Sequence, residues 1–175
     1  MIKYLFVVIL TLCFAHAAPK TAYNAKVLED TYTLYALDAQ MRHKFQQSSV
    51  FFAELYKETS KKEYLYQSLR MLEQSNDIKA LSKSTLESLK TDPEDEILRR
   101  FEIIVLLKEG KFAEASQKAL VLSEKGKKSP DYLLYAETRL KLGDFSGATA
   151  ALKKSYDLNY DESTAERIAL IHRMI

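Results

Sequence analysis

The residue types that could carry out acid–base, nucleophilic or metal chemistry are few in this sequence and lie far apart. The chain holds three histidines, of which His43 and His172 are widely separated, and one cysteine, Cys13. No nucleophile elbow, P-loop, dinucleotide-binding fingerprint or His-Glu-x-x-His zinc motif is present. The sequence therefore predicts a protein that is not an enzyme, with no catalytic residue, cofactor, metal site or small-molecule substrate.

Carboxylates are plentiful, and their clearest cluster is Glu94-Asp95-Glu96. Acidic side chains stabilise the first turn of a helix, where the backbone dipole is positive, so this cluster predicts a helix start. The chain has 26 basic and 24 acidic residues, a net charge of +2, and loss of Lys3 would lower this charge by one. So small a net charge gives no reason to expect nucleic acid or an anionic membrane surface as a partner.

Residues 1–17 have the pattern of a signal peptide. A lysine precedes an apolar run from Tyr4 to Ala15, and Ala-His-Ala ends the segment. The run is shorter than the roughly 20 apolar residues that a membrane-spanning helix needs. We therefore expect cleavage after Ala17 rather than retention as an anchor, with a mature chain that begins at Ala18.

Cys13 lies inside this segment. The sequence Leu10-Thr11-Leu12-Cys13 loosely resembles a bacterial lipoprotein signal, but such signals have a small residue where this chain has Leu12, so lipid anchoring is not expected. A chain that begins at Ala18 has no thiol for a disulfide. An exported chain without cysteine favours a bacterial periplasm, with eukaryotic secretion as the alternative.

The composition indicates an all-α protein. Hydrophobic residues make up 47% of the chain and charged residues 29%, which suits a globular domain. Only four glycines and three prolines are present, too few to supply the turns of a many-stranded sheet.

Two similar stretches, KEGKFAEASQKA from Lys108 and KLGDFSGATAAL from Lys141, reveal an internal repeat. The two glycines are 33 residues apart, and stepping back from Gly110 by 34 and then 33 residues reaches two further positions, each followed two places later by a bulky apolar residue. The four positions are His43, Asn76, Gly110 and Gly143. Glycine accepts positive φ freely, and asparagine and histidine are enriched there, so each position can end a helix in the left-handed conformation.

Helical patterns flank each of these positions, so the repeating unit is predicted to be helix, tight turn, helix. The starts of two helices are predicted from capping-box sequences, Ser60-Lys-Lys-Glu63 and Ser163-Thr-Ala-Glu166, and a third from Ser129-Pro130.

The fourth unit resembles the tetratricopeptide repeat, a helical hairpin of about 34 residues. The resemblance rests on Tyr132, Ala136, Gly143, Phe145, Ala148 and Leu152. It implies an all-α solenoid in which a linker, 18–28, precedes four repeats at 29–61, 62–95, 96–128 and 129–162, and a C-terminal helix, 163–175, follows. Another kind of helical-hairpin array remains the alternative.

In tetratricopeptide repeat proteins, the first helix of each repeat lines a concave surface that binds a peptide or a partner helix. Together with the signal-peptide pattern, the resemblance therefore implies an exported scaffold for a partner protein, for which a role in cell-envelope assembly is expected. By register, its partner-binding residues are Tyr66, Arg70, Arg100, Ile104, Leu107, Lys108, Leu133, Glu137, Leu140 and Lys141, and Asp30, Thr33, Leu37, Gln40, Glu63 and Glu73 share this face. An ordinary solvated helix face is the alternative interpretation of the charged members.

The last helix, STAERIALIHRMI, carries an apolar stripe of Ile168, Ile171, Met174 and Ile175. Solenoids usually end with a helix whose outer face is polar. The stripe must therefore pack onto the fourth repeat, meet another copy, or meet further repeats. The second possibility gives the alternative function, a structural element that forms a homodimer through its C-terminal helix.

Overall fold

The computed structural model describes residues 22–174, and the side-chain surroundings of residues 26–173. The described residues form helices joined by short turns and contain no strand, which confirms the all-α prediction for this part of the chain. The helices are α2 (Ala22–Met41), α3 (Phe45–Thr59), α4 (Lys62–Gln74), α5 (Ile78–Thr91), α6 (Glu96–Lys108), α7 (Phe112–Gly126), α8 (Ser129–Lys141), α9 (Phe145–Leu158) and α10 (Glu162–Met174). The predicted signal peptide, residues 1–17, lies outside the described residues.

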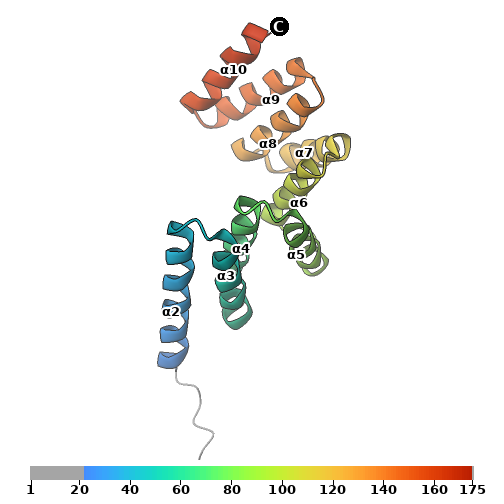
Figure 1. The fold of residues 1–175 in the computed structure, drawn as a ribbon. Coiled ribbons are helices and arrows are strands. Elements are labelled where there is room, and N and C mark those ends of the chain that lie inside the picture. Colours follow the sequence, from blue (N-terminus) through green and yellow to red (C-terminus); the bar gives the residue numbers. More distant parts are fainter. Residues whose placement is uncertain (1–21, 175) are drawn as a thin grey trace, which may run out of the picture.

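Consecutive helices pack against each other as hairpins, and the hairpins stack so that α2 and α10 lie at opposite ends of the molecule (Figure 1). The first helices of adjacent hairpins also contact one another, α4 with α6 and α6 with α8. Among the described residues, no two of the second helices α3, α5, α7 and α9 contact each other as closely as these first helices do. Because the stack is tighter on the side of the first helices, these helices form its inner side.

The four predicted turn residues all adopt the left-handed backbone conformation, as the sequence predicted. The φ angle is +57° at His43, +56° at Asn76, +76° at Gly110 and +75° at Gly143. In each turn the next residue's amide donates to the carbonyl five positions earlier, at 2.8 to 3.1 Å. This bond satisfies a carbonyl that the helix end would otherwise leave without a partner.

The two predicted capping boxes are wrong. Ser60 has a φ of +56° and ends α3, and α4 follows Lys61, whose side chain makes no capping bond. At α10 the cap is supplied by Asp161 instead of Ser163, because its Oδ2 accepts the Thr164 amide at 3.0 Å. Ser129 is the first residue of α8 rather than its cap, although Pro130 lies in the first turn as predicted.

Aspartates supply most of the side-chain caps that the structure shows. Asp95 Oδ1 accepts the Ile97 and Leu98 amides at 3.0 and 3.1 Å, which confirms that the acidic cluster marks a helix start. Asp77 and Asp144 cap α5 and α9 in the same way. A carboxylate satisfies otherwise unpaired amides and also interacts favourably with the helix dipole.

Apolar clusters fill the interfaces between adjacent hairpins. In the fourth hairpin Ala136 and Ala148 are fully buried beside Leu152, and these small side chains let α8 and α9 approach closely. In the second hairpin the larger Leu69 and Leu81 are also fully buried, in a cluster with Leu98 of α6. Counted from the turn residues, Leu69 and Leu81 occupy the repeat positions of Ala136 and Ala148. The core therefore accommodates large side chains at these positions as well as small ones.

Ion pairs along one edge of the stack link each hairpin to the next. They join residues about 30 positions apart, and most of these residues lie between the end of a second helix and the start of the next first helix. The paired residues are acidic in one hairpin and basic in the next, so neighbouring hairpins carry complementary charges at this edge. The pairs are Glu29 with Lys61, Lys62 with Asp92 and Asp95, Glu94 with Lys125, and Glu96 with Lys128. Most are exposed and each contributes little energy, but together they favour one order of stacking.

Candidate protein-binding surface

The inner surface of α4, α6 and α8 carries the residues predicted to bind a partner. Its apolar members, Ile104 and Leu107 of α6 and Leu133 and Leu140 of α8, are half-buried. Each packs with one side against an apolar cluster beneath it. They form an apolar floor whose outer side remains accessible to a partner.

Charged residues of both signs surround this floor. Arg70, Lys108, Glu137 and Lys141 are exposed. Within residues 26–173, none of the four has an ion-pair partner within 4.0 Å. Their charges are therefore not neutralised by ion pairs with described residues and are available to a partner.

Glu73 of α4 is half-buried on the same surface and also lacks an ion-pair partner in the described part of the chain. Burial raises the pKa of its carboxyl group, the positive charges of Lys108 and Arg70 partly oppose the rise, and the negative charge of Glu137 adds to it. These influences come from α4, α6 and α8, so the side chains lie close enough to interact across three hairpins. A partly desolvated carboxylate beside an apolar floor can bind a cationic group.

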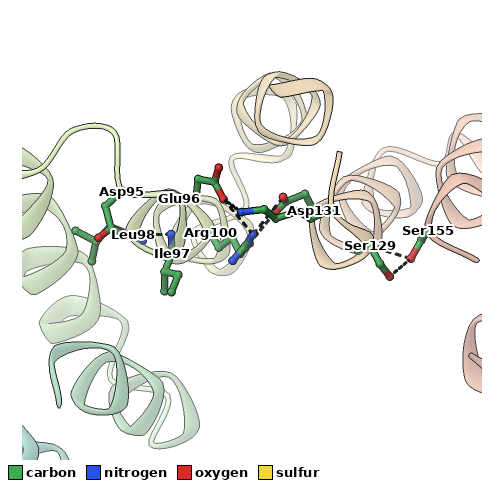
Figure 2. A network of polar contacts seen from close by, with 9 residues as sticks. Asp95, Glu96, Ile97, Leu98, Arg100, Ser129, Asp131 and Ser155 are labelled. Carbon is green, nitrogen blue, oxygen red and sulfur yellow. Dashed lines mark hydrogen bonds and ion pairs between the residues drawn. The ribbon is translucent and has the colours of Figure 1, made fainter. Parts of the chain in front are cut away.

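Two of the predicted partner-binding residues, Arg100 and Tyr66, form contacts between neighbouring hairpins. The Arg100 guanidinium binds the carboxylate of Asp131, with Nε to Oδ1 at 2.5 Å and a terminal nitrogen to Oδ2 at 3.2 Å (Figure 2). The Asp131 side chain is 0% exposed and that of Arg100 is 22% exposed. Arg100, predicted to bind a partner, is therefore not a free charge on the inner surface, because it neutralises a buried carboxylate of the next hairpin.

Tyr66 of α4 likewise links two hairpins. Its hydroxyl donates to Asp95 Oδ2 at 2.6 Å, and the ammonium group of Lys62 lies 2.8 Å from the same oxygen. Burial and this hydrogen bond raise the pKa of Tyr66 to about 12. Burial alone would raise the pKa of Asp95, but hydrogen bonds from Lys62, Tyr66 and the Leu98 amide more than offset it, so the pKa is lowered.

The sequence reasoning missed a cleft of about 520 Å³ between α6 and α7, on the other side of α6 from the inner surface. Its apolar lining includes Ile103 and Val121. Its charged rim is internally paired, since Glu102 contacts both Arg99 and Lys118. A charged ligand there would have to compete with these pairs, so the cleft is a weaker candidate than the inner surface.

The apolar stripe of the C-terminal helix is used within the chain. Ile171 is 4% exposed and packs with Ala148 and Leu152 of α9, and Ile168 is half-buried beside it. Ile171 is therefore not free to meet another copy, whereas self-association through the rest of the predicted stripe stays a prediction. The Met174 side chain and Ile175 lie outside the residues whose surroundings are described.

Within the described residues, no group of three or more histidine, cysteine, aspartate or glutamate side chains is arranged to hold a metal ion. None of the helices between residues 22 and 174 is both long enough and apolar enough to cross a membrane.

Comparison with known proteins shows similarity in structure only. No protein-family model matches the sequence. No curated protein matches it in sequence either. Among solved structures, MamA from residue 41 to its end, of Desulfovibrio magneticus RS-1, is similar with a TM-score of 0.64 and 16% identity, over 84% of this chain and 85% of that one.

Two other solved structures are similar over most of this chain. The pilF protein of Pseudomonas aeruginosa has a TM-score of 0.67 and 17% identity, covering 85% of this chain and 69% of its own. A tetratricopeptide repeat protein from Parabacteroides merdae ATCC 43184 has a TM-score of 0.67 and 14% identity, covering 87% and 59%. This chain thus spans less than two thirds of the Parabacteroides protein. Together with the stacked hairpins and their left-handed turns, these similarities show that the chain has the fold of tetratricopeptide repeat proteins.

Proposed function

We propose that this protein is a scaffold that holds a segment of a partner protein on the inner surface of α4, α6 and α8. The observation that carries the proposal is the combination of a half-buried apolar floor with charges that have no ion-pair partner in the described residues. Apolar contact supplies most of the energy in such an interface, and charges at its rim determine which partner binds. The repeats at 29–61, 62–95, 96–128 and 129–162 form the scaffold.

The segment that fits this surface best is amphipathic. Its apolar side chains would cover Ile104, Leu107 and Leu140, and its acidic side chains would meet Lys108 and Lys141. Arg70 replaces Arg100 as the third cationic residue, because Arg100 is paired with Asp131. A basic side chain in the segment would pair with Glu73, whose burial without an ion-pair partner is unfavourable in the free protein.

The test is the double variant Lys108→Glu with Lys141→Glu, used as bait in affinity capture from a cell-envelope extract. We expect loss of the wild-type partner and unchanged thermal unfolding, because both lysines are exposed. The control is Lys83→Glu with Lys153→Glu, two exposed lysines on second helices. Equal capture by both double variants would reject the inner surface as the site.

A photo-crosslinking residue locates the partner directly. Placed at Leu107 it should crosslink to the captured protein, whereas at Leu86, an exposed position on α5, it should not. Crosslinking from Leu86 alone would move the site to the second helices.

We also propose that the protein is exported and acts in the cell envelope, most simply in a bacterial periplasm. The support is the segment 1–17, with its apolar run and Ala-His-Ala ending. Mass spectrometry of the protein purified from its natural cells should give an N-terminus at Ala18. Recovery of the chain with Met1 intact in the cytoplasm would contradict export.

A further inference from the structure

One carboxylate interrupts a row of otherwise uncharged side chains on the first helices. Counted from the turn residues, the third position before each turn is half-buried in all four hairpins. Its occupants are Gln40 of α2, Glu73 of α4, Leu107 of α6 and Leu140 of α8. Glu73 is therefore the one charged residue of this row in the described hairpins.

Glu73 lies where the fold makes a carboxylate unfavourable. It is half-buried and has no ion-pair partner within residues 26–173. It also belongs to the last turn of α4, where the helix dipole is negative. The last turns of α6 and α8 contain basic residues, Lys108 and Lys141 among them, whereas the last turn of α4 contains none. The carboxylate therefore does not stabilise the free protein.

A stack of similar hairpins has to prevent a bound segment from shifting along it. Leu107 and Leu140 offer two similar apolar contacts one hairpin apart, so apolar contact alone does not determine where the segment sits. In paired helices, a single polar residue in the apolar seam fixes the register at a cost in stability. Glu73 has the position and the cost of such a residue.

We propose that Glu73 fixes the register and the direction of the bound segment by accepting one lysine or arginine side chain at the α4 end of the inner surface. This inference rests on the proposed function, in which acidic side chains of the segment meet Lys108 and Lys141. The segment is thus basic at α4 and acidic toward α8, with its apolar residues on Leu107 and Leu140.

Every other placement of such a segment brings like charges together. A shift of one hairpin toward α8 sets the basic side chain beside Lys108. A shift toward α2 sets an acidic side chain beside Glu73, and reversal of the segment does the same. Like charges that meet at an interface disfavour binding, so one placement is selected.

The charges around Glu73 leave its carboxylate free for this contact. Lys108 and Arg70 lie near enough to oppose the rise in its pKa, but neither forms an ion pair with it. Glu137 of α8 acts in the opposite sense and raises the pKa of Glu73 further. A basic side chain beside Glu73 is therefore also attracted by Glu137.

Random peptides displayed on phage identify the preferred segment without knowledge of the natural partner. First helices in contact pack about 10 Å apart, so an extended chain of about seven residues reaches from α4 to α8, and peptides of about ten residues suffice. Counter-selection on Lys108→Glu with Lys141→Glu removes peptides that bind elsewhere. The remaining peptides should have a basic residue on one side of an apolar stretch and acidic residues on the other, and peptides without a basic residue would overturn the proposal.

A selected peptide with a single basic residue then serves in a double-mutant cycle measured by calorimetry. Replacement of that residue by glutamine should weaken binding to the wild-type protein about tenfold, because a charge-assisted hydrogen bond is lost. The same replacement should have little effect on binding to Glu73→Gln. The control is Glu87→Gln, which changes an exposed glutamate of α5 and should keep the tenfold loss.

Moving the carboxylate by one hairpin tests the register itself. A photo-crosslinking residue next to the basic residue of the peptide should label α4 of the wild-type protein. In the double variant Glu73→Leu with Leu107→Glu it should label α6 instead, with helical content checked by circular dichroism. Label that stays on α4 of the folded double variant would overturn the proposal, and the calorimetric cycle tests it without this variant.

The lysine and glutamate variants separate this inference from the proposed function. Peptide binding that is lost in Lys108→Glu with Lys141→Glu but is equally sensitive to the basic residue in Glu73→Gln and wild type would overturn the role of Glu73 alone. If every enriched peptide bound the double lysine variant as well as it bound wild type, the inner surface and this inference would both be rejected.

Discussion

Arg100 of α6 neutralises Asp131 of α8, a side chain from the next hairpin that is 0% exposed. Glu96 of α6 lies 3.8 Å from the same guanidinium, and the Ser129 hydroxyl at the start of α8 contacts that of Ser155 at 2.8 Å (Figure 2). A Cβ atom on Gly126 would approach Asp131 Oδ2 to 3.1 Å, so the glycine leaves room for the carboxylate. This contact couples the third hairpin to the fourth through a buried charge.

Arg100→Met should lower the free energy of unfolding by about 3 kcal/mol, because it leaves the Asp131 carboxylate buried without its partner. Urea denaturation measures the change. Arg70→Met removes an exposed arginine without an ion-pair partner in the described residues, and it should cost less than about 0.5 kcal/mol. Adding Asp131→Leu to Arg100→Met should recover part of the loss, and equal costs for the two arginine variants would refute this role.

Gly143→Ala should lower the free energy of unfolding by about 1 kcal/mol, because φ is +75° at this turn. An added Cβ would have nothing within 4 Å, so the cost comes from the backbone and not from a clash. Thermal unfolding measures the effect, with the exposed Lys141→Ala as the control of little cost. A neutral Gly143→Ala variant would mean that the turn has another conformation.

Tyr66→Phe should destabilise the protein at pH 7 by about 1.5 kcal/mol, because the hydroxyl donates to the Asp95 carboxylate. The folded state raises the pKa of Tyr66 from 10.0 to about 12, so the phenol's contribution is complete below pH 10 and is lost as the pH rises toward 12. The difference in unfolding free energy between wild type and Tyr66→Phe should therefore shrink over this range. Tyr160→Phe, an 80% exposed tyrosine, is the control, and a difference that stays constant up to pH 11.5 would argue against the bond.

Glu73→Gln should stabilise the free protein at pH 7 by about 0.5 kcal/mol. Burial raises the pKa of Glu73, so the folded state favours the protonated form, and this preference is lost as the pH rises through the folded pKa. The advantage of glutamine should therefore disappear below about pH 4. Urea denaturation at several pH values, with the exposed Glu87→Gln as the control, measures it. A destabilised Glu73→Gln variant at pH 7 would show that the carboxylate has a partner in the fold.

Ile171→Ala should lower the free energy of unfolding by about 2 kcal/mol, because the side chain is buried against α9. The oligomeric state should not change. Leu170→Ala, the neighbouring exposed position on α10, should cost much less. If Ile171→Ala dissociated a dimer and left unfolding unchanged, the C-terminal helix would be an interface after all.

The sequence by itself determined the helical content, the hairpin unit and the four turns. Each of these depends on residues that are neighbours in the chain. Positive φ at His43, Asn76, Gly110 and Gly143 follows from the backbone preference of single residues, and the repeat interval made the four positions visible together. The resemblance to the tetratricopeptide repeat implied which helices line the inner surface, and the helical register then assigned Ile104 and Leu107 to one face of α6.

Only the tertiary structure decided which side chains on that surface are free. Arg100 and Lys108 are both cations on α6, yet Arg100 is paired because Asp131, 31 residues later, lies buried against it. Ile171 and Leu34 are both apolar residues of terminal helices, yet α9 covers the first and no described helix covers the second. Such differences depend on how hairpins about 30 residues apart meet, and this geometry is set by the packing of whole helices and not by any local residue preference.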